Sequence, residues 1–452
     1  MVNIYNFSKN VIQNLIRENK NNSSFTPILL VLCTIPLSFA INNIALGIFL
    51  VVALVTFKKT NFKVQKELVF PILLYVLMVI SYFWSIDQKE TLAALSKELP
   101  LLIIPLGFFL FKTNTAEEKK KIITYYSHVI VAFALYFLVR ATVRYFIYDD
   151  SRMFFYHGEN DKDYGLVPKL LNAIHMSVFV AIAFFYFFTK EIKSKTDHFC
   201  SLLLFGFILL LSSKNIILIV FVLSLIHIFF ISKAAHKLRL RNLIVFGLMI
   251  GILFSLGRIK DRFKVEFQSN TEKSLSTNVI EGVPAGVHYV SIKEAWTNPT
   301  FTPNDYFNGT SFRVYQFRIF TELIKENTIF LTGFGLNASY PKIKEKAIQY
   351  NLYMGVENDL DSGYQSKNFH NQYVQNFAEL GIFGFLLLLV ILFVNVKNAI
   401  KSKDFVHFAF AILMISLFLT ESFLWRQRGV VFFTMMYCLF NSRIFLKSSK
   451  AE

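Results

Sequence analysis

Polar side chains at the start of a long apolar run are the first candidates for chemistry in this sequence. The segment "NFHNQYVQNFAELGIFG" spans residues 368–384 and leads into "FLLLLVILFVNV". His370 begins an apolar helical stripe, while Asn371, Gln375 and Glu379 form a second line at a spacing of four. Because such a line is costly in lipid, we expect it to face a wet cavity or another helix at a membrane boundary. A histidine titrates near neutral pH, so His370 is a candidate general base.

A second segment, "TSFRVYQFRIFTELIKENTIFLTGFG" (310–335), predicts an amphipathic helix followed by a turn. Thr310 or Ser311 is suited to cap its N-terminus. Gly333 or Gly335 is expected to end the helix or to follow it in a turn.

The two arginines of this helix differ in their local partners. Arg318 has Glu322 four residues on, and Lys325 follows Glu322 by three, which predicts a solvated ion-pair ladder. Arg313 has no acidic residue three or four positions away on either side. Two interpretations of Arg313 stay open: it binds an anionic ligand, or its side chain is exposed or differently paired.

Other cations lie in short turns between apolar runs. Lys214 follows Ser212 and Ser213 in "LLLSSKNIIL", and Arg426 and Arg428 lie in "ESFLWRQRG". A single cation of this kind can extend its side chain to the membrane interface. Several on one face suit an anionic substrate held at the membrane surface.

The elements that must position these residues are membrane helices. The chain has 452 residues, 54% of them hydrophobic, including 52 Phe, which is typical of a polytopic membrane protein. A spanning helix needs about 20 mostly apolar residues. We therefore predict an all-α membrane protein with about twelve spans. The predicted runs lie at about 27–41, 42–56, 69–85, 99–112, 122–147, 168–189, 199–213, 214–232, 240–257, 373–396, 405–420 and 429–446.

The basic residues orient this topology. With the N-terminus in the cytoplasm, every second connection is basic, and these connections carry about half of the 47 Lys and Arg. The net charge of +17 therefore reflects membrane orientation, and no basic patch interleaved with aromatic residues indicates nucleic-acid binding. The prediction divides the chain into residues 1–257 with spans one to nine, a large extracytoplasmic loop at 258–370 with catalytic elements, and residues 371–452 with the last three spans.

Metal and disulfide chemistry find little support in the sequence. Cys33, Cys200 and Cys438 lie in or beside apolar runs without metal-ligand spacing, which is typical of small buried hydrophobic residues. The segment "DLDSG" (359–363) has two carboxylates but lacks the remaining ligands of a calcium loop. We expect neither a metal nor another cofactor.

Several of these segments resemble the O-antigen ligase and polymerase family of bacterial membrane glycosyltransferases. "HNQYVQNFAELGIFG" resembles its most specific motif, His-Asn followed by Glu-x-Gly-x-x-Gly. "FRVYQFRIFTELIKENTIFLTGFG" resembles its Arg-then-aromatic helix, and "LLLSSKNIIL" resembles its Ser-Arg turn, with Lys214 in place of arginine. "SYFWSIDQKETLAALSKELPLLIIPL" (81–106) and "ESFLWRQRGVVFF" are similar to an early outward loop and a penultimate turn of the family. Lysine keeps the charge of that arginine but loses its bidentate geometry.

The resemblance implies a function and roles for the residues. The donor is a glycan on an undecaprenyl pyrophosphate carrier at the periplasmic face of the inner membrane, and the acceptor is a sugar hydroxyl. His370 is then the general base, and Arg313 and Lys214 stabilise the leaving pyrophosphate. The remaining candidates for substrate binding are Asn371, Glu379, Gly333, Gly335, Arg426 and Arg428. The expected reaction is metal-independent and inverts the anomeric centre.

Three functions remain open. A ligase uses lipid A–core as the acceptor and is the function we favour, because the His-Asn motif is complete. A polymerase uses another carrier-linked glycan. A polysaccharide transporter or flippase also has about twelve spans, but transporters carry broken helices near the midplane and related halves.

Overall fold

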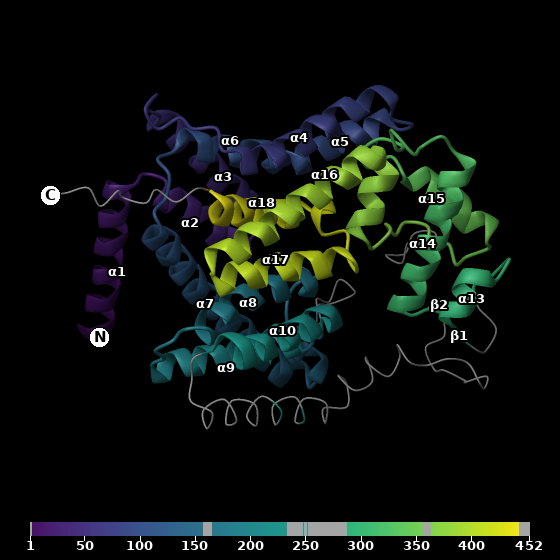
Figure 1. Ribbon diagram of the computed structural model, residues 1–452. Coiled ribbons are helices and arrows are strands. Elements are labelled where there is room, and N and C mark those ends of the chain that lie inside the picture. The colour runs from purple at the N-terminus through teal and green to yellow at the C-terminus, as the bar shows by residue number, and fades with distance from the viewer. Residues whose placement is uncertain are drawn as a thin grey trace.

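The computed structural model describes residues 2–156, 165–232, 247, 251, 287–355 and 363–442, and this part of the chain is almost entirely helical (Figure 1). Its helices are α1 Val2–Asn21, α2 Phe25–Thr34, α3 Phe39–Val55, α4 Lys66–Ile80, α5 Gln88–Glu98, α6 Pro100–Leu110, α7 Ala116–Tyr148, α8 Ala173–Phe188, α9 Lys195–Leu210, α10 Lys214–Ile226, α13 Ile292–Thr297, α14 Gly309–Glu326, α15 Tyr340–Gln349, α16 Gln372–Ser402, α17 Phe405–Phe418 and α18 Gln427–Asn441. Short helical turns lie at η1 Ser81–Trp84, η2 Ser151–Phe154, η3 His227–Ile231 and η4 Phe423–Trp425.

Among the described residues, five helical segments are long and apolar enough to cross a membrane. They are Lys66–Trp84, Gln88–Leu110, Ala116–Tyr148, Lys214–Ile231 and Gln372–Ser402. Shorter apolar helices lie at Phe25–Thr34, Phe39–Val55, Ala173–Phe188 and Phe405–Phe418. Every predicted run overlaps a described helix except 240–257, which lies outside the described residues apart from residues 247 and 251. The helical fold is thus confirmed, and the count of twelve spans stays a prediction.

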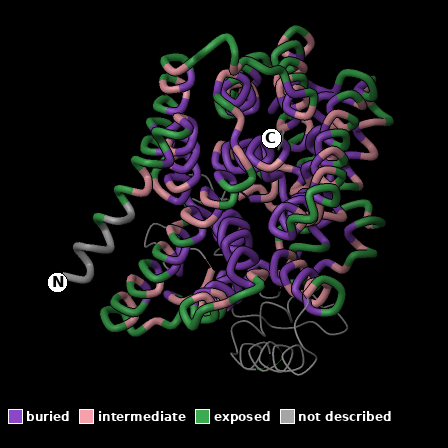
Figure 2. The backbone as a smooth tube through the Cα atoms, turned by 60° about the vertical axis from the view of Figure 1, so that its left-hand side comes forward, coloured by how far each residue is buried: buried purple, intermediate pink, exposed green. Residues whose placement is uncertain are grey.

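Helix α8 forms the centre of the bundle. All of its side chains except Ile174 are buried, as expected for a helix that is apolar on every face. It packs against α7, α9 and α17, so that lipid-facing helices surround it. Figure 2 shows the same gradient, with buried segments inside and exposed ones at the periphery.

Capping explains where several of these helices begin. Thr115 and Glu118 form a capping box at α7, and Ser194 and Asp197 form one at α9. Because both boxes satisfy backbone N–H groups that a helix leaves unpaired, they fix where these two helices begin.

A smaller unit with its own core lies between α10 and α16 in the sequence. It contains α13, α14, α15 and two short parallel strands, β1 His288–Val290 and β2 Asp305–Phe307, in which His288 pairs with Asp305. Its apolar core includes Phe301, Tyr315 and Ile319 and is separate from that of the bundle. Figure 1 shows this unit at one end of the bundle and α1 at the other.

Helix α16 joins the two units. Its first turns contribute Val374 and Ala378 to the core of the smaller unit, and its later part belongs to the bundle. Between them the helix is kinked at Gly381, where φ is 65° and ψ is −163°. An added Cβ at Gly381 would lie 2.1 Å from the carbonyl oxygen of Leu331, so the kink and this close approach both require glycine.

Candidate active site

The connection between α17 and α18, residues 419–426, collects contacts from distant parts of the chain; we call it the α17–α18 turn. Asn215, next to Lys214 at the start of α10, donates to Thr420 Oγ1 at 2.7 Å. Arg313 on α14 donates from Nε to the carbonyl oxygen of Thr420 at 2.9 Å. Three segments that are separate in the sequence therefore meet at one turn.

His370 reaches the same turn from the segment before α16. The helix begins at Gln372 rather than at His370, because the side chain of Asn371 accepts hydrogen bonds from the N–H groups of the second and third helical residues. The Nδ2 of Asn371 donates to the carbonyl oxygen of Leu419 at 3.2 Å, which ties the cap to the α17–α18 turn.

The backbone of His370 lies in the left-handed region, with φ of 47°. Its N–H donates to Asn368 Oδ1 at 3.0 Å, which supports this unusual conformation. A non-glycine residue in this region costs free energy and recurs at functional sites. The ring packs edge-on against Phe312 with centroids 5.8 Å apart, so α14 and the turn together fix its orientation.

Glu421 is the partner of His370, and our sequence reasoning missed it. Its Oε2 lies 3.6 Å from His370 Nδ1, and the carboxylate is buried. Burial alone would raise the pKa of Glu421, but hydrogen bonding and attraction to His370, with attraction to His175 and Arg426, outweigh burial and lower the pKa from 4.5 to about 2. The sequence held one signal: Glu421 opens the quoted segment "ESFLWRQRG", and an acid between two apolar runs needs a partner.

Nε2 of His370 has no hydrogen-bond partner in the described ranges, and the side chain is 29% exposed. A carboxylate at Nδ1 favours the tautomer that carries its proton there, which leaves Nε2 as a proton acceptor. The pair thus has the arrangement of a general base and its orienting acid.

Arg313 makes its hydrogen bonds with backbone carbonyls. Besides Thr420, its Nη1 donates to the carbonyl oxygen of Gly309 at 2.8 Å. Among the described residues, no carboxylate lies within ion-pair distance of it. Arg313 is thus hydrogen-bonded to a distant part of the chain, and its binding of an anion stays a prediction.

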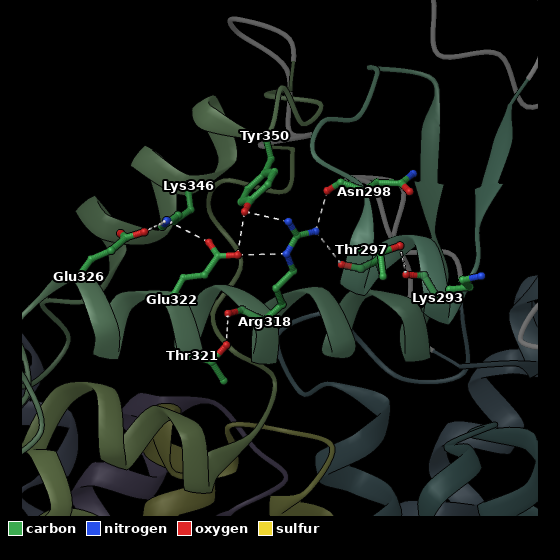
Figure 3. A network of polar contacts seen from close by, with 10 residues as sticks. Lys293, Thr297, Asn298, Arg318, Thr321, Glu322, Glu326, Lys346 and Tyr350 are labelled. Atoms are coloured by element: carbon green, nitrogen blue, oxygen red, sulfur yellow. Dashed lines mark hydrogen bonds and ion pairs between the residues drawn. The ribbon is translucent and has the colours of Figure 1, made fainter.

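Arg318, five residues further along α14, is fixed in a network of polar contacts (Figure 3). It donates to Glu322 at 3.1 Å, to the carbonyl oxygen of Asn298 at 2.7 Å and to the hydroxyl of Tyr350 at 2.9 Å. The predicted pair with Glu322 is confirmed. The prediction of a solvated ladder with Lys325 is wrong: Arg318 is only 12% exposed, and Glu322 pairs with Lys346 at 3.0 Å. The reason is that α15 packs over this face of α14.

Lys214, Arg426 and Arg428 have different positions relative to the α17–α18 turn. Lys214 is the first residue of α10 and is partly exposed. Arg426 precedes α18, is partly exposed and acts electrostatically on Glu421. Arg428 is buried, donates to the carbonyl oxygens of Leu37 and Leu170 and lies 4.3 Å above the Phe39 ring. Arg428 therefore anchors α18 to α3 and to the segment before α8. Lys214 precedes Asn215, the residue of α10 that contacts the turn.

Gly333 and Gly335 lie in the turn after α14, which ends at Glu326, and both have positive φ. This agrees with the prediction that the glycines follow the helix in a turn rather than end it. An added Cβ at Gly333 would lie 2.3 Å from the carbonyl carbon of Glu379, and the N–H of Gly335 donates to the carbonyl oxygen of Glu379 at 2.9 Å. The glycines thus let this turn pack on the kink of α16 and position Glu379.

Glu379 lies apart from His370. It is buried, accepts a hydrogen bond from Gln375 and lies 3.4 Å from Ser339 Oγ. Of the predicted site residues, the structure therefore brings Arg313, His370, Asn371 and Arg426 to the α17–α18 turn. Lys214 precedes Asn215, which contacts the same turn, and Glu379 lies with the glycines in a neighbouring region.

The arrangement combines a candidate base with several cations. It can take a proton from a hydroxyl and stabilise negative charge on a departing group. In the part of the chain that the structure describes, no group of three His, Cys, Asp or Glu could hold a metal ion; "DLDSG" lies outside it except for Gly363.

Comparison with known families identifies the central part of the chain. Residues 199–389 match the sequence model of a family described as O-antigen ligase. This part of the chain is similar to the O-antigen ligase family. A comparison with curated proteins gave no match.

The matched segment includes Lys214, Arg313 and His370, together with the turn glycines and Glu379. The α17–α18 turn, with Glu421, Arg426 and Arg428, follows after the matched residues. The resemblance deduced from the motifs is thus confirmed at the level of the family.

Proposed function

We propose that this protein is a membrane glycosyltransferase that transfers a glycan from an undecaprenyl pyrophosphate carrier to a sugar hydroxyl at the periplasmic face of the inner membrane. The observation that carries the proposal is the convergence of His370, Arg313 and the Lys214-bearing start of α10 on the α17–α18 turn. The favoured acceptor is lipid A–core, which makes the protein an O-antigen ligase; polymerisation onto a second carrier-linked glycan uses the same chemistry.

The reaction is a single displacement at the anomeric carbon. Nε2 of His370 takes the proton of the acceptor hydroxyl as its oxygen forms a bond to that carbon. The bond between the anomeric carbon and the pyrophosphate oxygen breaks, and the oxygen leaves with the electron pair. Attack from the side opposite the leaving group inverts the configuration.

Each charged residue has a role in this step. Glu421 orients His370 and stabilises the imidazolium that forms. Arg313 and Lys214 stabilise the charge that develops on the pyrophosphate, and Arg426 adds positive potential. Arg428 holds α18 in place. Because pyrophosphate is already a good leaving group, the proposed step needs no metal ion.

The test is surface-glycan analysis of a strain that lacks this protein, complemented at matched membrane levels with wild type, His370→Ala or His288→Ala. His288 is a matched control, because it lies in the same small unit but is 42% exposed and pairs with Glu294. The proposal predicts full glycan with wild type and His288→Ala and none with His370→Ala.

The products distinguish the alternatives. Core without glycan beside long carrier-linked chains indicates a ligase, and core with a single repeat unit indicates a polymerase. A flippase would move the carrier-linked glycan without forming a glycosidic bond, so transfer by purified protein argues against it.

A further inference from the structure

Helix α1 stands apart from the membrane-crossing helices and has no role in the mechanism above. Figure 1 shows it at the end of the bundle opposite the small unit, where it runs across the direction of α9, α10 and α17. It is not among the described segments that are long and apolar enough to cross a membrane. Its place in the fold therefore needs an explanation other than membrane crossing.

The contacts of α1 place it at the boundary of the lipid. Lys112, in the connection between α6 and α7, donates to the carbonyl oxygen of Asn21 at 3.3 Å. Lys121, near the start of α7, donates to Glu18 of α1 at 2.9 Å. Two of the candidate membrane spans, those that end with α6 and begin with α7, meet at this connection. Because α1 crosses the direction of the spans where they leave the lipid, it runs along the membrane surface.

One face of α1 suits this position. Ile12, Leu15 and Ile16 lie on the same side of the helix, since residues three and four apart are neighbours. Leu15 packs against the apolar core of the bundle, so this face is turned towards the bundle and the lipid around it. Ile12 and Ile16 are 56% and 52% exposed. An apolar face that continues beyond the protein core in this way fits the acyl-chain boundary of a membrane.

Two lysines lie at the edge of this face. Lys9 precedes Ile12 by three positions and Lys20 follows Ile16 by four, and both lysines are exposed. A lysine stem can follow the apolar surface while its charge reaches the headgroups. Glu18, the only acidic residue in α1, is buried and ion-paired with α7, so it does not face the lipid beside these charges. The lysines therefore match the phosphate groups of anionic phospholipids.

We propose that α1 is an interfacial helix that binds anionic phospholipids at this end of the bundle, with Ile12 and Ile16 among the acyl chains and Lys9 and Lys20 at the phosphate groups. The surface lies at the opposite end of the bundle from the proposed transfer site, so the inference does not depend on the proposed function. A second copy of the chain is the competing occupant. A symmetric contact between two such faces would bring lysines together, which like-charge repulsion disfavours.

The depth of single residues in the membrane tests the placement. Cys33→Ala removes the partly exposed native cysteine, and Cys200 and Cys438 are buried, so a fluorophore can be attached to one new cysteine in the full-length protein. The new cysteine is Ile12→Cys or, as a matched control, Asn21→Cys. Both positions are exposed, and nine residues place them on opposite sides of the helix.

The labelled proteins are compared in nanodiscs of phosphatidylcholine and phosphatidylglycerol. Phospholipids brominated on their acyl chains should quench the fluorophore at position 12 and leave the fluorophore at position 21 nearly unchanged. Iodide in the buffer should do the reverse, because position 21 faces water.

Amide hydrogen exchange along α1 tests the choice of phospholipid, since it reports the ratio of bound to free helix. Each cation at an anionic surface changes this ratio by about five-fold. Replacing phosphatidylglycerol with phosphatidylcholine should therefore speed exchange by about 25-fold in the wild type, which has two such lysines. A variant with Lys9→Gln and Lys20→Gln should exchange at similar rates in both lipids.

Three results would overturn the inference. Equal quenching by brominated lipid at positions 12 and 21 would mean that α1 has no membrane-facing side. Protection of position 12 from both brominated lipid and iodide would mean that protein, such as a second copy of the chain, covers this face. Equal exchange rates in the two lipids for the wild type would contradict the assignment to anionic phospholipids.

Discussion

The pairing of His370 with Glu421 gives the sharpest prediction, for the substitution Glu421→Gln. Glutamine keeps the size of the side chain and removes its charge. Two opposite charges about 4 Å apart near a protein surface attract each other by about 4 kcal/mol. The two groups lie 3.6 Å apart, and the 29% exposure of His370 adds solvent screening that lowers this value. We expect a loss of about 2–3 kcal/mol in transition-state stabilisation, or about 100-fold in kcat.

The assay is glycan transfer by the purified protein in lipid nanodiscs, with kcat and KM measured against pH. The loss should appear in kcat, because Glu421 acts on the candidate base. Glu421→Asp should recover part of the activity.

A double-mutant cycle decides whether Glu421 acts through His370. If it does, Glu421→Gln should cost little in the His370→Ala background, because the two groups act as one unit. Additive losses, or a normal kcat in Glu421→Gln, would refute the assignment of Glu421 as the orienting acid.

Further predictions follow from other contacts. Arg313→Ala should reduce kcat by about 100-fold or more with little change in melting temperature. Arg318→Ala should instead destabilise the protein by about 3 kcal/mol, because it breaks a buried network of polar contacts. Activity and thermal unfolding are measured for both variants, and the same behaviour of the two would contradict this prediction. Gly381→Ala should lower the melting temperature or prevent folding, since its Cβ would lie 2.1 Å from a carbonyl oxygen, while Gly206→Ala, with nothing within 4 Å of its added Cβ, should be tolerated. Because the pKa of Glu421 lies at about 2 rather than 4.5, its contribution to stability is present above pH 4.5 and is lost as the pH falls towards 2. In Glu421→Gln, the melting temperature should therefore depend less on pH between 4.5 and 2. Transfer should continue in excess EDTA, and restoration of chelated activity by a divalent ion would contradict the metal-free mechanism.

Local patterns in the sequence predicted much of the fold. Apolar runs of the right length located the helices, because burial in lipid or in the bundle requires them. The contact between Arg318 and Glu322 also followed from their spacing, since residues four apart are neighbours on a helix. The sequence also predicted that Gly333 and Gly335 either end the helix or follow it in a turn, and they follow it.

Features that depend on distant contacts were not predictable in this way. Glu421 pairs with His370 across 51 positions, and the burial of Arg318 depends on the packing of α15. The start of α14 is capped by Asn308 rather than by Thr310 or Ser311, because Asn308 Oδ1 accepts from the N–H groups of both. The kink at Gly381 follows from the close approach of residue 331, which no local pattern reveals.

The central claim is that His370 is the base for glycan transfer, and transfer by purified His370→Ala in nanodiscs tests it most directly. Donor binding is followed in the same samples, with His288→Ala as the control. We predict that His370→Ala binds the carrier-linked glycan as wild type does but forms product at least about 1,000-fold more slowly. Product formation at the wild-type rate would contradict the claim and leave His370 a structural residue.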